Sequence, residues 1–446
     1  MSNAPEGSGS APAGLRMPAE SAPHAATWMA YGATVSAWGD DTTSPFGRDL
    51  SNSRTIARQD LMRLAANLSR FEPVFMLVDS DADKAQATGY LEAIVAQTSA
   101  KDQFHDTVDG SGRIHLGEGK SPANLPPIRK HPITFVVQHI NDLWTRDTAP
   151  VFALDADGRL HGVDLNFNCW GQSPLTTGLP GWTKDPEKTK NGVIDQPIDG
   201  DRHVAEAVNR YVRAPGVKTW LTMEGGGLEV NGRGLGIACE SNIVNDNRNP
   251  GKTRAEIEAE LRRLFGVEKM LWLPGVKGEE LTDWHIDFTA RFTSPSDLLF
   301  AFDTNFEPED QRNQKALAAA VSQINALSAD EKARYLGSAT ATLKTHELPV
   351  PDQKKVFTAF AARNTPSITE RGLEEFILTS AAGYVGYYEA NGCVIMAQCG
   401  DVDLDRQAYK TVQGLYPDRT VIQITSDGIA SGGGTMHCAT QQQPSA

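Results

Sequence analysis

The chain of 446 residues lacks long apolar runs, and no stretch approaches the roughly 18 apolar residues that a membrane-spanning helix needs. It also lacks any dense run of Lys and Arg, and its 56 acidic against 42 basic residues give a formal net charge of −14. Nucleic acids and anionic membranes attract basic patches, so this balance argues against both as partners. An acidic chain is compatible with a small cationic ligand.

Cysteine is scarce, and its five residues form no Cys-x-x-Cys pair. This number and spacing argue against a disulfide framework and a structural zinc site, and they favour a reduced, cytoplasmic protein. The glycines at 432–434 are not followed by the Lys-Ser/Thr of a phosphate loop, and no Gly-x-Gly-x-x-Gly opens a helix after a strand. No His-Glu-x-x-His motif or other close His pair is present, which leaves a metal hydrolase as a less favoured alternative.

The domain organisation that we predict is simple. Residues 1–16 (MSNAPEGSGSAPAGLR) are rich in Gly, Ser, Pro and Ala and have no apolar core of a secretory signal, so we predict a disordered leader. No linker rich in Pro and Ser interrupts the rest of the chain. We therefore predict a single catalytic domain over residues 17–446.

Strand-like and helix-like segments alternate along this domain. Short β-branched or apolar runs predict buried strands at 73–78, 133–140, 270–276, 298–303, 393–398 and 420–425. Turn residues at 155–158 and at Asn231-Gly232 predict two hairpins. Thr253 and Glu256 form a capping box before a helix that Gly266 ends, and Leu317, Val321, Ile324 and Leu327 mark a second amphipathic helix. The pattern predicts an α/β protein that contains antiparallel pairs.

Four segments concentrate polar residues beside strand-like sequence: NDLWTRD (141–147), MEGGG (223–227), TDWHID (282–287) and GGGTMHC (432–438). Each alone has a structural explanation, such as a surface ion pair, a strand end, a buried histidine or a buried thiol. The one cysteine, two histidines and five acidic residues in these segments can supply a thiol, a histidine and three carboxylates to one site. If 282–287 is a strand, His285 and Asp287 project to the same face. A thiol with a histidine is the usual minimum for thiolate catalysis, and several carboxylates suit a guanidinium.

The chain resembles the agmatine deiminase and bacterial peptidylarginine deiminase family, within the guanidino-modifying (pentein) superfamily. The similarity is collinear over most of residues 17–444. It is carried by MPAESAPHAATWMAYG (17–32), NDLWTRDTAP, GVDLNFNCWG (162–171), MEGGGLEV, NRNPGKTRAEIEAEL (247–261), HIDFTARF, NGCVIMAQCGD (391–401) and GGGTMHCATQQ.

The resemblance implies a five-bladed α/β propeller of ββαβ modules that acts without metal or organic cofactor. By motif, Cys438 is the nucleophile and His285 the general acid and base, with Asp287 paired to that histidine and touching a substrate nitrogen. The residues expected to bind substrate are Asp147 and Glu224, which grip the guanidinium, together with Trp144, Trp284 and Gly434. The implied reaction is hydrolytic deimination through a covalent Cys thiouronium, with release of ammonia.

The chain departs from the family pattern at five positions: Gly32, Trp284, Phe288, Gly386 and Thr435. At these positions the family commonly has, in the same order, Pro, Gly, a small or polar residue, Asn, and Asn or a similar residue. Residues 166–182 contain no Arg or Lys that could bind the carboxylate of an arginine substrate. We therefore favour a small cationic guanidine, agmatine, which would give N-carbamoylputrescine.

Two alternatives stay open. One is a deiminase of another guanidine, of arginine or of peptidylarginine. The other, of a different class, is a noncatalytic pentein that binds guanidines, although it would have no need to retain the thiol, the histidine and the three carboxylates. A homo-oligomer is compatible with the sequence.

Overall fold

The computed structural model describes residues 14–38, 53–97, 107–108, 114–115, 125–171, 197–278, 281–302, 308–364 and 380–446. Within these ranges, five sheets repeat one pattern. Two antiparallel strands are followed by helical sequence and by a third strand, which pairs parallel to the second. The repeat is the ββαβ module that the resemblance implied.

Four modules follow one another along the chain. The first module contains β6 (Val151–Leu154), β7 (Leu160–Val163), α6 (Val204–Val212) and β8 (Gly216–Val217), and the second contains β9 (Glu229–Val230), β10 (Leu235–Cys239), α7 (Glu240–Ile243), α8 (Arg254–Phe265) and β11 (Lys269–Leu273). The third module contains β12 (Ala290–Ser294), β13 (Asp297–Phe300), α9 (Pro308–Asn325), α10 (Ala329–Leu336) and β14 (Lys344–Glu347). The fourth contains β15 (Tyr388–Ala390), β16 (Cys393–Ala397), α13 (Val402–Leu415) and β17 (Thr420–Ile424).

The fifth module joins the two ends of the chain. Its first strand, β18 (Gln441–Pro444), pairs antiparallel with β1 (His24–Ala30), and β1 pairs parallel with β2 (Val74–Val78). The helices α1 (Val35–Trp38) and α2 (Ser53–Leu68) lie between β1 and β2 in the sequence, and α3 (Asp81–Gln97) leads to an added parallel strand, β5 (Ile133–Val137). The last residues of the fold therefore complete a sheet that the first residues begin.

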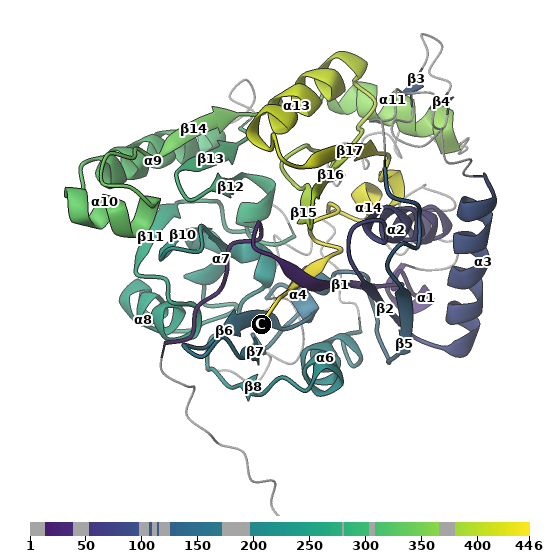
Figure 1. Ribbon diagram of the computed structural model, residues 1–446, viewed down its shortest axis with the longest axis horizontal. Coiled ribbons are helices and arrows are strands. Elements are labelled where there is room, and N and C mark those ends of the chain that lie inside the picture. The colour runs from purple at the N-terminus through teal and green to yellow at the C-terminus, as the bar shows by residue number, and fades with distance from the viewer. Residues whose placement is uncertain are drawn as a thin grey trace, which may run out of the picture.

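The five sheets surround a common centre, and α3, α6, α8, α10 and α13 lie towards the rim (Figure 1). The remaining short elements are β3 (Thr107–Val108), β4 (Ile114–His115), α4 (Thr145–Thr148), α11 (Gln353–Asn364), α14 (Asp427–Ser431) and the 3₁₀ turns η2 (Asp201–His203), η3 (Gly225–Gly227) and η4 (Ile286–Phe288). The mixed α/β architecture agrees with the predicted fold class.

Local sequence signals explain where several elements begin and end. Thr253 and Glu256 form the predicted capping box of α8, and Gly266 ends the helix with a left-handed φ of 67°. Each of the six predicted strands is confirmed, as are both hairpins. The second amphipathic helix is confirmed as α9, but it ends before Leu327.

The predicted end of the leader at residue 16 is wrong. Leu15 is buried and packs in the apolar cluster that contains α8, and Arg16 pairs with Leu154, the last residue of β6. Burial of Leu15 holds this segment against the second module, and two backbone hydrogen bonds between Arg16 and Leu154 hold it against the first. Residues 1–13 lie outside the described part of the chain.

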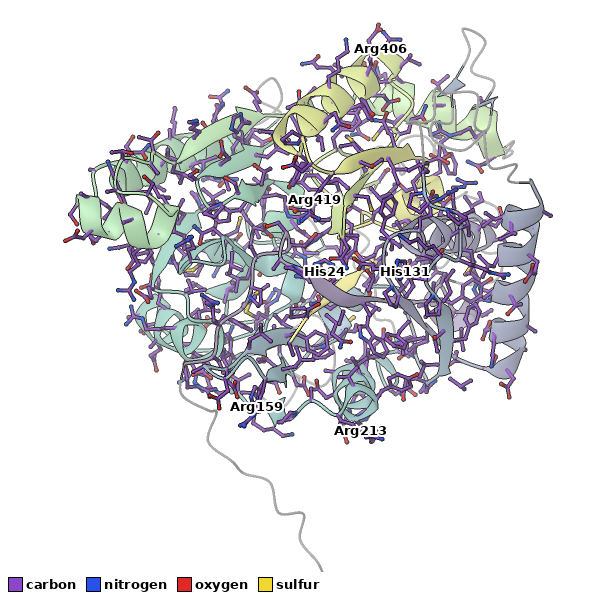
Figure 2. The ribbon with its side chains drawn as sticks, in the orientation of Figure 1. His24, His131, Arg159, Arg213, Arg406 and Arg419 are labelled. Carbon is purple, nitrogen blue, oxygen red and sulfur yellow. The ribbon has the colours of Figure 1, made fainter. Side chains whose placement is uncertain are left out.

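Apolar packing continues from the modules into the centre. The largest buried cluster joins β1, β2, β16 and β17 and includes Trp144 and Cys438. Charged side chains such as Arg159 and Arg406 are exposed at the rim (Figure 2). None of the helices in the described ranges is long and apolar enough to cross a membrane.

Candidate active site

Four of the five modules place a short polar segment directly before their first strand. Helix α4 precedes β6, the turn η3 precedes β9, the turn η4 precedes β12, and the turn that carries Cys438 precedes β18. These segments meet in space, because α4 contacts η3, η3 contacts η4, and the amide of Arg146 on α4 donates to Cys438 O at 3.0 Å. The four polar motifs of the sequence therefore form one site.

The candidate nucleophile, Cys438, lies in the tight turn between α14 and β18. Cys438 is 4% exposed, and its Sγ lies 3.5 Å from Asp287 Oδ2 and 3.4 Å from Thr435 Oγ1. Burial, with added repulsion from Asp287 and Asp147, raises the pKa of the Cys438 thiol well above its ordinary value. In the absence of a cationic ligand, the group is a thiol.

His285 is the base candidate, and carboxylates surround it. Its Nε2 lies 3.1 Å from Glu224 Oε2, and its Nδ1 lies 4.0 Å from both Asp147 Oδ1 and Asp287 Oδ1. Burial alone lowers the pKa of His285, but Asp147, Glu224 and Asp287 outweigh it and raise the pKa to about 9. Within the described residues the buried Nδ1 has no hydrogen-bond partner, so it remains available to a ligand.

Residues 282–287 do not form a strand, although His285 and Asp287 still lie close to each other. His285 precedes the 3₁₀ turn η4, which contains Asp287. Asp287 is instead hydrogen-bonded through Oδ2 to Nδ1 of His437, at 2.7 Å. The turn still brings both side chains to the same place, but by a different backbone path.

His437 connects the site to a buried ionic cluster. Its Nε2 lies 2.8 Å from Glu20 Oε2, and Glu20 also pairs with Arg146 at 3.2 Å and Arg291 at 2.9 Å. Burial would raise the pKa of Asp287, but the hydrogen bond to His437 together with the charges of His437, His285 and Arg146 outweighs burial and lowers the pKa. Asp287 is thus held as a carboxylate, and its buried Oδ1 accepts no hydrogen bond within the described residues.

The side chains of the site converge above Gly226, the middle glycine of MEGGG. A Cβ atom on this residue would lie 2.6 Å from His285 Nδ1, 2.9 Å from Asp287 Oδ2 and 3.2 Å from Asp147 Oδ1. Such distances leave no room for a side chain at position 226, so only a glycine lets His285 and the two carboxylates close on the backbone there. Gly226 was not among the predicted site residues.

Asp147 is oriented by a tryptophan from another segment. Trp170 Nε1 donates to Asp147 Oδ2 at 2.9 Å, and the amide of Gly226 lies 3.3 Å from Oδ1. Burial, reinforced by the Glu224 and Asp287 charges and only partly offset by His285, raises the pKa of Asp147 to about 6. This carboxyl group therefore titrates just below neutral pH.

Glu224 has the most partners of the three carboxylates. Both of its oxygens lie 2.9 Å from Arg248 Nε, and Oε2 also accepts from Asn242 at 3.2 Å and from His285. Burial would raise the pKa of Glu224, but Arg248 and His285 lower it to about 2. The geometry gives Glu224 a clear role in orienting His285, while its direct contact with a guanidinium stays a prediction.

The remaining predicted residues lie at different distances from this centre. A Cβ on Gly434 would clash with the ring of Trp144, so these two residues pack directly together beside the nucleophile turn. Trp284 packs against the apolar cluster of the third module, and its Nε1 donates to Thr289 Oγ1 at 3.0 Å. The structure therefore brings Trp144 and Gly434 to the turn of Cys438, while the indole of Trp284 packs on a different part of the core.

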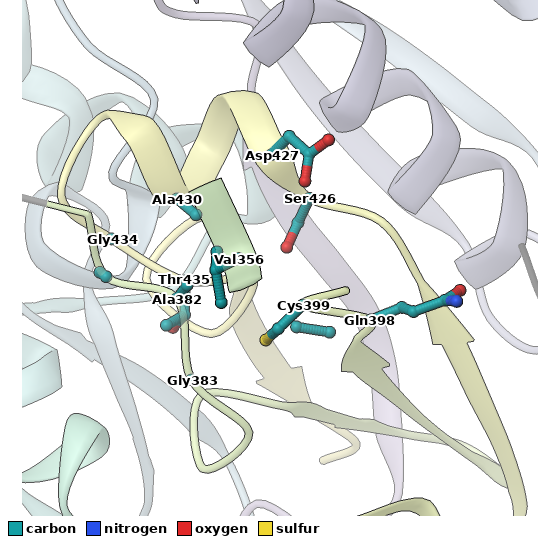
Figure 3. A pocket seen from close by; sticks show the side chains of 12 residues that line it. Val356, Ala382, Gly383, Gln398, Cys399, Ser426, Asp427, Ala430, Gly434 and Thr435 are labelled. Atoms are coloured by element: carbon teal, nitrogen blue, oxygen red, sulfur yellow. The ribbon is translucent and has the colours of Figure 1, made fainter. Parts of the chain in front are cut away.

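A small cavity lies behind the nucleophile turn (Figure 3). Its volume is ≈ 10 Å³, which is enough for about one water molecule. Thr435 and Gly434 form part of its wall, with Ser426, Asp427 and Cys399 among the others. It is too small for a guanidine, and it separates the turn from the fourth module.

Sequence reasoning missed the residues that hold the carboxylates in place: Glu20, Trp170, Arg248 and His437. All four stand inside segments that carried the family resemblance, which was the available signal. Their partners lie between 23 and 417 positions away, so no local pattern indicated the contacts. Within the described ranges, no group of three or more His, Cys, Asp or Glu residues is arranged to hold a metal ion.

The chain is similar to known proteins over nearly its whole length. Residues 16–444 match the Porphyromonas-type peptidyl-arginine deiminase family. The agmatine deiminase of Stutzerimonas stutzeri (strain A1501) is 30% identical over 433 residues, which cover 97% of this chain and 96% of that protein. The agmatine deiminase of Pseudomonas fluorescens (strain Pf-5) is 31% identical over 313 residues, 70% of this chain and 77% of that one. The solved structure of an agmatine deiminase of Enterococcus faecalis superposes with a TM-score of 0.68 at 25% identity, covering 99% of both chains.

Proposed function

The chain belongs to the Porphyromonas-type peptidyl-arginine deiminase family, and on that premise we propose that it is an amidine hydrolase that converts agmatine and water to N-carbamoylputrescine and ammonia. The relatives of similar length, to which it is about 30% identical, are agmatine deiminases. The observation that carries the proposal is the convergence of Asp147, His285 and Asp287 above Gly226, with the thiol of Cys438 beside Asp287.

Substrate binding uses the carboxylates. A guanidinium presents N–H donors in a planar fork, which buried carboxylates can bind in a fixed orientation. Asp147 Oδ1 and Asp287 Oδ1 each lie 4.0 Å from His285 Nδ1, and Glu224 contributes a negative charge on the other side of that ring. Burial and the neighbouring carboxylates raise the pKa of Cys438, and the bound cation offsets part of this effect. On substrate binding the thiol therefore releases its proton to solvent and becomes the thiolate.

The first chemical step forms a carbon–sulfur bond. Cys438 Sγ attacks the central guanidinium carbon, and the resulting tetrahedral adduct loses one nitrogen as ammonia. His285 donates the proton that this leaving group needs, which its pKa of about 9 permits at neutral pH. The product of this step is a covalent thiouronium on Cys438.

The second step breaks the same bond. His285, now neutral, accepts a proton from a water molecule that adds to the thiouronium carbon. Collapse of the adduct cleaves the C–S bond, returns the thiolate to Cys438 and releases the ureido product. One water is consumed and one ammonia released for each turnover.

The test is turnover of a panel of guanidines by the purified protein, with ureido product and ammonia both measured. We expect agmatine to exceed arginine and a blocked arginyl peptide in kcat/KM by roughly tenfold or more, because a carboxylate without a cationic partner is costly to desolvate. Equal turnover of arginine would contradict the choice of substrate. Absence of turnover for every guanidine, with Cys438 unreactive towards a haloacetamidine, would favour the noncatalytic alternative.

Three broader proposals accompany the function. Residues 17–446 act as one catalytic domain, which the pairing of β1 with β18 supports. The protein is cytoplasmic, as five cysteines without a disulfide bond suggest. The homo-oligomer stays a prediction, to be measured by sedimentation velocity.

A further inference from the structure

The hydroxyl group of Thr435 has no part in the mechanism described above, although it contacts the reacting sulfur. Thr435 Oγ1 lies 3.4 Å from Cys438 Sγ, and the side chain is buried in the same turn. We propose that this hydroxyl is a further catalytic group, which donates a hydrogen bond to the Cys438 thiolate, and that Gly386 is the residue that gives it room. The inference rests on the proposed function, because it concerns the thiolate that attacks the guanidine.

The side chain of Thr435 fills the space that a side chain at position 386 would need. A Cβ atom on Gly386 would clash with Oγ1, Cβ and Cγ2 of Thr435, so no larger residue at 386 is compatible with the present position of the hydroxyl. The carbonyl of Gly386 also accepts a hydrogen bond from the amide of His437 at 3.1 Å, which fixes the turn one residue before the nucleophile. The two departures from the family pattern at 386 and 435 are therefore one linked arrangement.

The charges around the sulfur explain why a hydroxyl donor matters there. Asp287 on η4 lies 3.5 Å from Sγ, and Asp147 on α4 adds a second negative charge. The cations on the neighbouring segments face other groups: His437 lies between Asp287 and Glu20, and the guanidinium of Arg146 binds Glu20 and Gln442. His285 Nδ1 faces Asp147 and Asp287.

A hydroxyl suits both states of the sulfur. It can rotate to accept a hydrogen bond from the neutral thiol and to donate one to the thiolate, without movement of its own oxygen. The hydrogen bond from Thr435 lowers the pKa of Cys438 against burial and the two carboxylates. A hydrogen bond to a charged group is worth more than one between neutral groups, so its effect concerns the thiolate.

The experiment follows alkylation of Cys438 by iodoacetamide as a function of pH, in the intact protein and without a guanidine. The modified peptide is identified by mass, because four other cysteines are present. Thr435→Val removes the hydroxyl and keeps the shape, and Thr435→Ser keeps the hydroxyl. We expect the valine variant to show a higher alkylation pKa and a rate at pH 8 that is lower by roughly tenfold or more, while the serine variant stays close to the unmodified protein.

Two further variants guard against a misfolded valine protein. Thr435→Ala also lacks the hydroxyl and adds no bulk, so it is expected to reproduce the higher pKa. Gly386→Ala displaces the Thr435 side chain and is expected to raise the pKa as well. Thermal unfolding identifies the variants that fold. If the folded valine or alanine variant alkylates with the same pH dependence as the unmodified protein, the proposal is overturned.

Turnover separates this proposal from the proposed function. The alkylation result does not depend on which guanidine is hydrolysed. If agmatine is not a substrate but Thr435→Val still raises the alkylation pKa, the hydroxyl has its assigned role and the substrate is wrong. If agmatine is turned over and all three variants at 435 alkylate alike, the substrate stands and the role of the hydroxyl is wrong.

Discussion

The carboxylate side of the site and its thiol side are held in different ways. Asp147, Glu224 and Asp287 each bind a side chain from a distant part of the chain, whereas Cys438 contacts one carboxylate and a hydroxyl of its own turn. The partners of Glu224 and Asp287 hold the carboxylate charges in place before any ligand arrives. The thiol has no comparable cationic partner among the side chains that contact it in the described residues, so its activation depends on the substrate.

This difference fits a reaction on a cation. Preorganised acceptors cost no reorganisation when a guanidinium binds. A thiol that ionises only beside that guanidinium is protected from other electrophiles and oxidants, because the thiolate is the reactive form. The predictions below disturb first the thiol side and then the carboxylate side.

Loss of the thiol has the largest expected effect. Cys438→Ala removes the nucleophile, so turnover of agmatine falls to background, because no thiouronium can form. Binding of agmatine, measured by calorimetry, is expected to change by only a few-fold, since the carboxylates remain. Cys399→Ala removes another buried cysteine and is the matched control, which retains turnover. Residual catalysis by Cys438→Ala would contradict the covalent mechanism.

The space above Gly226 is the next target, since it lies on the carboxylate side. Gly226→Ala places a methyl group against His285, Asp287 and Asp147. We expect kcat/KM to fall by roughly a hundredfold, because a displacement of about 1 Å is enough to misalign a bound substrate. Gly89→Ala in α3, where a methyl group meets no atom within 4 Å, is the control with unchanged kinetics. Normal activity of Gly226→Ala would place the substrate elsewhere.

His437, the hydrogen-bond partner of Asp287, can be substituted without removing a group assigned to substrate binding. His437→Gln is expected to lower kcat by roughly tenfold and to destabilise the fold by about 3 kcal/mol, since it breaks a buried hydrogen-bonded charge network. Chemical denaturation and steady-state kinetics measure the two effects. His139→Gln is a surface control, because the side chain of His139 is 55% exposed although it also lies between two carboxylates. A stability loss with unchanged kcat would show that His437 has only a structural role.

The smallest expected effect is a shift in pH dependence. Asp147 binds the cation only when ionised, so kcat/KM is expected to fall as the pH decreases through about 6, the pKa of Asp147. It is expected to fall again as the pH rises through about 9, where His285 loses the proton that ammonia needs.

Substitution of Trp170 is expected to shift only the acid limb of the pH profile of kcat/KM. Its hydrogen bond lowers the pKa of Asp147, so Trp170→Phe should raise the acid limb by a fraction of a pH unit and leave the alkaline limb in place. An alkaline limb that moves by the same amount would mean that the substitution altered the whole site. An acid limb that does not move would mean that another group controls it.

Much of the fold and the site could be predicted from residues. The capping box at Thr253, the hairpin turn at Asn231-Gly232 and the six strands depend on local geometry, which a short window of sequence contains. The family motifs identified Cys438, His285, Asp147, Glu224 and Asp287. The backbone path of residues 282–287 was left open by the sequence, because a strand would bring His285 and Asp287 together and the 3₁₀ turn does so as well.

The sequence by itself therefore determined the elements, the chemical groups of the site and the family to which they belong. Tertiary structure alone decided which side chain holds which carboxylate, that Gly226 is the point of convergence, and that Gly386 and Thr435 share one space. The physical reason is that local patterns follow from backbone geometry over a few residues. The contacts that set charge and packing in the site join turns from separate modules, and they exist only when those modules close around one centre.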